Sequence, residues 1–311
     1  MAFMLSAIVL IVSLCVLVKA SSIFTDRAEK IGLFFGLSPF IIGVTIVSIG
    51  TSLPELVSSL VAVFKGSTEI VIGNVVGSNI ANICLVLALA AILAKKIKLN
   101  YSLMHVDLPL LMATSFLFAL TIWDGVFSLG DALICLTAFF VYITYTVHTK
   151  KSHPDSSVKK LSADKLTSLD VGILLLSALF IYLGAEYTIR SVIDISTILN
   201  VGTELIAVTV VALGTSLPEL AVTIDVVRKG KGEIGVGNVL GSNIFNAMAV
   251  TSIPAFFSNL VVPASILTFA LPLMLMATLM LVFMTQEKEI TQWEGFVLLL
   301  FYVFFIVKLF F

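Results

Sequence analysis

Ten apolar stretches, each long enough to cross a lipid bilayer, occupy most of the 311 residues of this chain. A helix needs about 20 apolar residues to span the hydrocarbon core. Hydrophobic residues make up 59% and charged residues only 12% of the sequence, a balance that excludes an ordinary soluble domain. The sequence therefore predicts an all-α polytopic membrane protein with ten transmembrane helices, at residues 2–20, 38–64, 70–94, 102–122, 126–148, 168–190, 204–227, 233–255, 262–284 and 292–310.

The first stretch has the length of a secretory signal peptide, but it lacks the basic segment with which such peptides begin, and further spans follow it. We expect it to be the first transmembrane helix. One polar, charge-rich stretch at 148–168 divides the ten spans into five and five. We interpret residues 1–148 as a first five-helix repeat, 149–167 as a cytoplasmic linker and 168–311 as a second five-helix repeat.

The 18 lysines and arginines predict the orientation in the cell membrane, because cationic loops stay on the cytoplasmic side. With the N-terminus outside, only Lys65, Arg190 and Lys308 fall outside. We therefore expect both termini outside and the linker inside. The cytoplasmic set comprises Lys19, Arg27, Lys30, Lys95, Lys96, Lys98, Lys150, Lys151, Lys159, Lys160, Lys165, Arg228, Lys229, Lys231 and Lys288.

One heptapeptide, GTSLPEL, occurs twice, at 50–56 and at 214–220, each time inside an apolar stretch. Residues 50–82 align with 214–246 without a gap, at a constant offset of 164, and 20 of the 33 positions are identical. Because each repeat contains five spans, the second repeat enters the membrane from the opposite side. The pattern predicts inverted repeats, which many secondary transporters use, with the site near the midplane of the bilayer.

Each repeat contains two polar clusters, GTSLPE at Gly50–Glu55 and Gly214–Glu219, and GNVVGSNIAN or GNVLGSNIFN at Gly73–Asn82 and Gly237–Asn246. Glycine and proline interrupt a membrane helix and free carbonyl groups, which is tolerated only where the backbone is buried in protein or lines a cavity. One interpretation of Ser-x-x-Glu is a capping box at a restarted helix. We favour a functional role, because a carboxylate near the bilayer centre costs about 3 kcal/mol or more.

The first cluster offers only oxygen ligands, namely the carboxylates of Glu55 and Glu219, hydroxyl groups and freed carbonyls. Hard cations such as Ca²⁺ prefer a shell of oxygens, and two carboxylates neutralise the charge of one Ca²⁺. The clusters contain no histidine or cysteine, which argues against zinc or copper. The first cluster therefore indicates a site for a hard cation.

In the second cluster, Ser78 and Asn82 lie four residues apart and share one helix face, and Ser242 and Asn246 repeat this spacing. The G-x-x-x-G spacing of the same cluster is typical of close helix packing in membranes. We expect both roles, with glycines that allow close approach and with serine and asparagine side chains that face the site.

The paired GTSLPE and GNVxGSNI motifs resemble the α-repeats of the calcium/cation antiporter superfamily, specifically the prokaryotic type of its sodium/calcium exchanger branch. The resemblance covers the whole ten-helix layout. It implies a secondary antiporter that exchanges Na⁺ for Ca²⁺ electrogenically by alternating access, without a cofactor.

The resemblance also implies roles for individual residues. Glu55 and Glu219 would coordinate Ca²⁺ together with the backbone carbonyls of Thr51 and Thr215. Asn82 and Asn246 would complete the central position. Na⁺ would use the side chains of Thr51, Ser52, Ser78, Thr215, Ser216 and Ser242 and the carbonyls of Ser48 and Ala212.

Two features of the sequence differ from those of other branches of the superfamily. Potassium-dependent exchangers have aspartate where this chain has Asn246, so we expect no coupling to K⁺. Calcium/proton antiporters contain a GNAxE type of motif, which this chain lacks. Exchange of Ca²⁺ for protons stays the alternative, because the two glutamates could bind protons instead of Na⁺.

Three other carboxylates admit two interpretations each. Asp225 is either a way-station at the cytoplasmic mouth or, as we favour, an interfacial group paired with Arg228 and Lys229. Glu69 and Glu233 begin their helices, where a carboxylate suits the positive end of the helix dipole. We expect capping rather than attraction of cations.

Other classes of function fit less well. An intramembrane hydrolase would give the two glutamates different roles, whereas the halves are equivalent, so we expect no enzyme. A cation channel usually gains its symmetry from several subunits. The net charge of −1 gives no basic field for nucleic acid. The expected partners are Ca²⁺, Na⁺ and the lipid bilayer, with no obligate protein partner.

Overall fold

The computed structural model describes residues 2–34, 48–99, 104, 107–152, 167–230 and 232–310, and these ranges are helical almost throughout. The first half of the chain forms α1 (Ala2–Phe34), α3 (Ser48–Thr51), α4 (Leu53–Phe64), α5 (Glu69–Ala81), η2 (Asn82–Leu87), α6 (Ala88–Ala94), β1 (Lys96–Lys98), α7 (Leu108–Thr121), β2 (Val126–Phe127) and α8 (Leu129–Ser152). The second half forms α9 (Ser168–Leu199), α10 (Thr203–Ile206), η4 (Ala207–Val211), α11 (Ala212–Thr215), α12 (Leu217–Arg228), α13 (Gly232–Phe245), η5 (Asn246–Val250), α14 (Ser252–Ala255), β3 (Leu260–Val261), η6 (Ile266–Ala270), α15 (Leu271–Met284), η7 (Thr285–Glu287), β4 (Glu289–Thr291) and α16 (Gln292–Phe310).

Within the described ranges, seven helices are long and apolar enough to cross a membrane. Two shorter apolar helices, Leu53–Phe64 and Leu108–Thr121, accompany them. The prediction of an all-helical polytopic membrane protein is therefore confirmed. The count of ten spans stays a prediction, because part of the expected span at 38–64 lies outside the described residues. The seven are Phe3–Ala28, Glu69–Ala94, Leu129–Thr146, Ser168–Leu199, Thr203–Arg228, Ile266–Glu287 and Gln292–Leu309.

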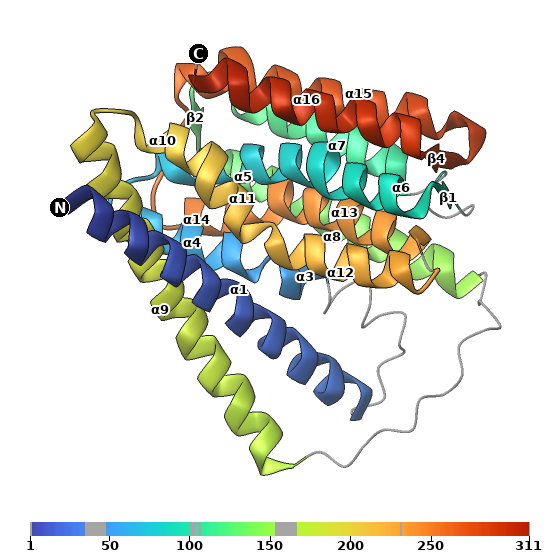
Figure 1. Cartoon of the computed structure of the whole chain (residues 1–311), viewed down its shortest axis with the longest axis horizontal. Coiled ribbons are helices and arrows are strands. Elements are labelled where there is room, and N and C mark those ends of the chain that lie inside the picture. Colours follow the sequence, from blue (N-terminus) through green and yellow to red (C-terminus); the bar gives the residue numbers. More distant parts are fainter. Residues whose placement is uncertain are drawn as a thin grey trace.

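The helices differ in how deeply they lie in the molecule. In the apolar window of Glu69–Ala94, 83% of the residues are buried, against 28% for Phe3–Ala28 and for Ser168–Leu199. The continuous helix α5–η2–α6 therefore runs through the centre of the bundle. Helices α1 and α9 pack along each other and lean away from the other helices at one side (Figure 1).

Two short antiparallel ribbons connect loops of the two halves. Strand β1 pairs with β4, with Ile97 opposite Ile290, and β2 pairs with β3, with Phe127 opposite Leu260. All four of these side chains are buried. Each ribbon therefore ties a loop of the first half to a loop of the second through backbone hydrogen bonds and apolar contact.

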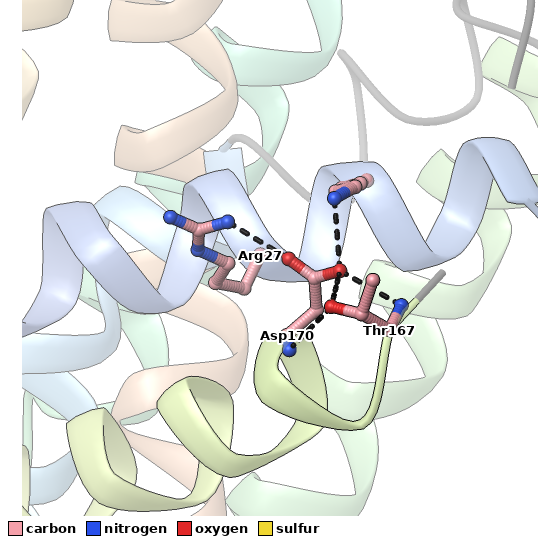
Figure 2. Close-up of polar contacts among 4 residues, drawn as sticks. Arg27, Thr167 and Asp170 are labelled. Carbon is pink, nitrogen blue, oxygen red and sulfur yellow. Dashed lines mark hydrogen bonds and ion pairs between the residues drawn. The ribbon is translucent and has the colours of Figure 1, made fainter. Parts of the chain in front are cut away.

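An ionic cluster joins α1 to the start of α9 (Figure 2). The carboxylate of Asp170 accepts hydrogen bonds from Arg27 Nη1 and Lys30 Nζ, both at 2.8 Å. The same carboxylate accepts from the backbone and hydroxyl of Thr167, and Thr167 caps α9 in return. Because the cap and the ion pairs share one carboxylate, the start of α9 and its attachment to α1 depend on the same group.

A second ionic cluster ties α9 to α4, about 24 Å further along α9 at 1.5 Å per residue. Glu186 accepts from Lys65 Nζ at 2.8 Å and from Arg190 at 2.7 Å. Lys65 directly follows α4. Helix α9 is therefore attached to α1 near its first residues and, further along, to the end of α4.

Glycines allow α5 to approach the second half closely, as the G-x-x-x-G spacing predicts. A Cβ atom at Gly73 would lie 2.8 Å from the carbonyl oxygen of Glu204. A Cβ atom at Gly77 would overlap the carbonyl oxygen of Val208 and lie 2.7 Å from Cβ of Ala212. The backbone of α5 thus packs directly against α10, η4 and α11.

We predict that Gly77→Ala destabilises the protein by about 1–3 kcal/mol, the usual cost of overpacking, because the overlapped oxygen belongs to the backbone and cannot rotate away. The measurement is thermal or denaturant unfolding in detergent. The control is Gly172→Ala on α9, another helical glycine, where an added Cβ meets nothing within 4 Å. Equal behaviour of the two variants would contradict the proposed close packing at Gly77.

Candidate functional site

The two copies of GTSLPE form interrupted helices. Helix α3 ends at Thr51 and α4 begins at Leu53, and the residue between them, Ser52, has φ −90° and ψ 11°. Ser216 occupies the same place between α11 and α12, with φ −82° and ψ 3°. A proline follows two residues after each serine. Because proline has no N–H, it cannot donate to the carbonyl four residues earlier.

Helix α1 covers both interruptions. The hydroxyl of Ser21 donates to the carbonyl oxygen of Gly50 at 2.7 Å, which satisfies the group that Pro54 leaves without a helical donor. Nearer the start of α1, the side chain of Leu14 lies against Gly214. A Cβ atom added at Gly214 would come within 2.8 Å of this side chain. One helix therefore closes over the equivalent break in each repeat.

The interrupted helices bring the two predicted carboxylates together. Glu55 stands in the first turn of α4 and Glu219 in the first turn of α12, and both are fully buried. Their polar neighbours come from both repeats, because Ser52 donates to Glu219 Oε1 and Ser78 contacts both Glu55 Oε1 and Thr215 Oγ1. Glu55 lies beside Thr215 and Ser78. Glu219 lies beside Ser52 and also beside Thr51 and Ser242, which correspond to Thr215 and Ser78 at the repeat offset.

The hydrogen bond of Ser52 crosses between the repeats and excludes the capping-box interpretation. Ser52 Oγ donates to Glu219 Oε1 at 2.8 Å, although Glu219 belongs to the other repeat. Ser78 Oγ contacts Glu55 Oε1 at 3.4 Å. Neither Ser52 nor Ser216 caps its helix through its side chain. The hydroxyl of Ser52 therefore donates to a carboxylate of the other repeat and does not accept from the first turn of α4.

The backbone carbonyl of Ala212, one of the predicted ligands, lies among the hydroxyl groups. Its oxygen is 3.5 Å from Ser78 Oγ and 3.4 Å from Thr215 Oγ1. Thr215 Oγ1 also reaches Asn74 Oδ1 at 3.3 Å. The equivalent carbonyl in the first repeat belongs to Ser48, the first residue of α3. Asn74 was not among the predicted site residues, although the GN dipeptide recurs in both repeats.

Asn82 and Asn246, predicted for the central position, are fully buried. Each begins a π-helical segment, Asn82 in η2 and Asn246 in η5. Such segments often occur at functional sites, because one widened turn changes the face on which the following side chains lie.

Several oxygen atoms of these residues are buried and have no hydrogen-bond partner among the residues that the structure describes. A buried acceptor of this kind costs about 1–3 kcal/mol when nothing satisfies it, and more when it is charged. Carboxylate, amide and hydroxyl oxygens are the ligands that Ca²⁺ and Na⁺ use, so the residues present fit a hard cation. The atoms are Glu55 Oε2, Glu219 Oε2, Asn82 Oδ1, Asn246 Oδ1, Ser216 Oγ and Ser242 Oγ.

Asp225 and Glu69 lie apart from this site. Asp225 is exposed and pairs with Lys229 Nζ at 2.5 Å, which confirms the predicted pairing with Lys229. Glu69 begins α5 and accepts a hydrogen bond from Thr203 Oγ1 at 2.5 Å, so it links α5 to α10. The side chain of Glu233 lies outside the described residues.

Known proteins match this chain over almost its whole length. The sequence model of the family described as "Sodium/calcium exchanger protein" matches residues 5–148 and 169–311. The chain is 33% identical to the sodium/calcium exchanger MaX1 of Methanosarcina acetivorans, over 98% of each chain, and 34% identical to the inner membrane protein YrbG of Escherichia coli, over 82% of this chain and 81% of that one. The solved structure of the sodium-calcium exchanger NCX_Mj soaked with Na⁺ and Sr²⁺ superposes with a TM-score of 0.70 at 28% identity, covering 98% of both chains.

The hydrogen bond between the repeats generates a testable asymmetry. We predict that Ser52→Ala destabilises the ion-free protein by about 1–3 kcal/mol, because the buried Glu219 carboxylate loses its short hydrogen bond. Ser216→Ala removes a hydroxyl that has no partner and should be close to neutral. Unfolding of both variants in the absence of Na⁺ and Ca²⁺ is the measurement, and equal losses of stability would contradict the assigned bond.

Proposed function

The chain belongs to the sodium/calcium exchanger protein family, and we propose that it is a secondary antiporter that exchanges Na⁺ for Ca²⁺ by alternating access. The observation that carries this function is the full burial of Glu55 and Glu219, one from each repeat, each with one carboxylate oxygen that finds no hydrogen-bond partner in the described part of the chain. Two such charges in the centre of an apolar protein need cations to balance them.

In the proposed site, both carboxylates and the carbonyls of Thr51 and Thr215 bind Ca²⁺, while Asn82 and Asn246 add neutral amide oxygens. Na⁺ uses the hydroxyl groups around the carboxylates and the carbonyls that precede each break. This division is the one that the family resemblance implies, and it agrees with charge in that one Ca²⁺ neutralises both glutamates. The Na⁺ ligands are the side chains of Thr51, Ser52, Ser78, Thr215, Ser216 and Ser242 and the carbonyls of Ser48 and Ala212.

The proposed architecture is ten transmembrane helices in two inverted five-helix repeats, 1–148 and 168–311, joined by a cytoplasmic linker at 149–167, with both termini outside. Contacts between loops support it. The predicted topology puts the segments of β1 and β4 on one side of the membrane and those of β2 and β3 on the other, and each pair forms a ribbon. Two cations that it puts outside, Lys65 and Arg190, share Glu186.

The packing of helices of one repeat against those of the other also supports alternating access. Helix α5 of the first repeat packs against η4 and α11 of the second, while α13 of the second packs against α3 of the first. A cation bound at Glu55 and Glu219 therefore contacts both repeats at once. A relative movement of the repeats would change the exposure of the site to either side while keeping the ligands together.

The proposed site requires both carboxylates. We predict that Glu55→Gln and Glu219→Gln each abolish Na⁺-dependent Ca²⁺ uptake into proteoliposomes, because one charge does not balance a desolvated divalent cation. The variants should still insert and fold, since glutamine preserves the shape. Asp225→Asn, on the exposed face of α12, is the control and should retain uptake. Normal exchange by either glutamine variant would remove the proposed site.

Charge counting at the site predicts electrogenic exchange. The empty site has a charge of −2 from its two glutamates, one Ca²⁺ brings it to zero, and the three Na⁺ implied by the family resemblance bring it to +1. Each cycle that imports one Ca²⁺ and exports three Na⁺ then removes one positive charge. One elementary charge moved through 100 mV corresponds to about 2.3 kcal/mol, so an interior-positive potential should accelerate Ca²⁺ uptake and an interior-negative one should slow it.

The measurement is ⁴⁵Ca²⁺ uptake into Na⁺-loaded proteoliposomes whose potential is set by K⁺ and valinomycin. Uptake that ignores the potential would indicate a neutral exchange of two Na⁺ for one Ca²⁺. Uptake driven by a pH gradient in the absence of Na⁺ would favour the alternative, exchange of Ca²⁺ for protons.

A further inference from the structure

Two asparagines without a role in the proposed site, Asn79 and Asn243, meet where α5 crosses α13. They occupy equivalent positions of the two repeats, 164 residues apart, and each is 1% exposed. Asn79 Nδ2 donates to the carbonyl oxygen of Asn243 at 3.2 Å, and Asn243 Nδ2 donates to the carbonyl oxygen of Asn79 at 3.3 Å. The two side chains thus form a reciprocal clasp between the repeats.

The clasp determines how the amide of Asn243 is oriented. A backbone carbonyl can only accept a hydrogen bond, so the atom that Asn243 presents to Asn79 must be Nδ2. The other amide atom of Asn243, Oδ1, accepts a hydrogen bond from Asn82 Nδ2 at 2.9 Å. Since that acceptor can face only a donor, Asn82 must present its nitrogen to Asn243.

Asn82 is therefore left with its oxygen free. Asn82 Oδ1 is buried and has no hydrogen-bond partner. An amide oxygen is a ligand for Na⁺ and Ca²⁺, whereas an NH₂ group is not. A rotation of the Asn82 amide by 180° would exchange the two, and the bond to Asn243 prevents this rotation.

The second repeat has no equivalent arrangement in this structure. Both amide atoms of Asn246 and the Oδ1 atom of Asn79 are buried without a hydrogen-bond partner. The clasp is symmetric between Asn79 and Asn243, but only Asn243 extends it to an asparagine of the site.

We propose that Asn243 is a positioning residue that holds the amide of Asn82 with its oxygen available to the cations. This inference rests on the proposed function, since it concerns the same site. Asn243 acts through Asn82 and does not itself bind the cations. Loss of a group that orients a metal ligand typically weakens binding 10- to 100-fold, and this is the effect to be expected here.

The chain offers a matched control. Asn243→Ala removes one bond of the clasp and the bond to Asn82. Asn79→Ala also removes one bond of the clasp, but it keeps the Asn79 carbonyl that orients Asn243, and hence the bond to Asn82. Without ions we expect a larger loss of thermal stability in Asn243→Ala, which loses two side-chain hydrogen bonds, than in Asn79→Ala, which loses one. The half-saturating Ca²⁺ concentration should rise about tenfold or more in Asn243→Ala and stay within about twofold in Asn79→Ala.

A double variant tests whether the effect passes through Asn82. If it does, Asn82→Ala combined with Asn243→Ala should bind Ca²⁺ no more weakly than Asn82→Ala alone, because the two residues act as one unit. An additive loss, or an equal loss of affinity in Asn79→Ala, would overturn the inference. If Asn243→Ala does not fold, Asn243→Ser carries the same expectations.

Two readouts separate this inference from the proposed function. The first is stabilisation of the detergent-solubilised protein against thermal unfolding by titrated Ca²⁺ or Na⁺, which requires binding but no transport. The second is Na⁺-dependent ⁴⁵Ca²⁺ uptake. A wild-type protein that binds Ca²⁺ but does not exchange it refutes the proposed function, whereas normal wild-type exchange with unchanged affinity in Asn243→Ala refutes only the role of Asn243.

Discussion

The burial of two carboxylates is the constraint that the centre of this bundle has to satisfy. Glu55 and Glu219 are fully buried among hydroxyl groups of both repeats. The hydroxyls of Ser52 and Ser78 donate to them, but neutral donors do not cancel two buried charges. Cations at this site would be part of the folded core, so their binding energy would contribute to the stability of the whole bundle.

The position of this pair could be predicted from the sequence because two constraints act together. The motif recurs at a constant offset, and the predicted five spans per repeat would turn the second copy upside down, which brings equivalent residues to the same depth. The local pattern left one alternative open. Ser-x-x-Glu describes a capping box as well as it describes Ser52 bonded to Glu219 of the other repeat, because spacing along the chain carries no information about which side chain lies across from it.

The asparagines also show that spacing along the chain does not predict which group a side chain contacts. Asn79 and Asn82 are three residues apart and identical in both repeats, yet Asn79 contacts a backbone carbonyl while Asn82 contacts a side chain. That difference depends on where α5 crosses α13 and on the π-helical turn that begins at Asn82. Both features follow from tertiary packing, and hydrophobic periodicity does not report them.

The dependence of each carboxylate on the other half of the chain has a consequence for biosynthesis. Glu55 lies beside Thr215, and the nearby carbonyl of Ala212 also belongs to the second half. At a translation rate of about 5–20 residues per second, the ribosome needs roughly 8–30 s after Glu55 to reach these residues. For that interval the first half is in the membrane with a carboxylate that has Ser78 of its own half but lacks the neighbours that the second half supplies. Water or the insertion machinery must shield Glu55 from lipid until the second half arrives.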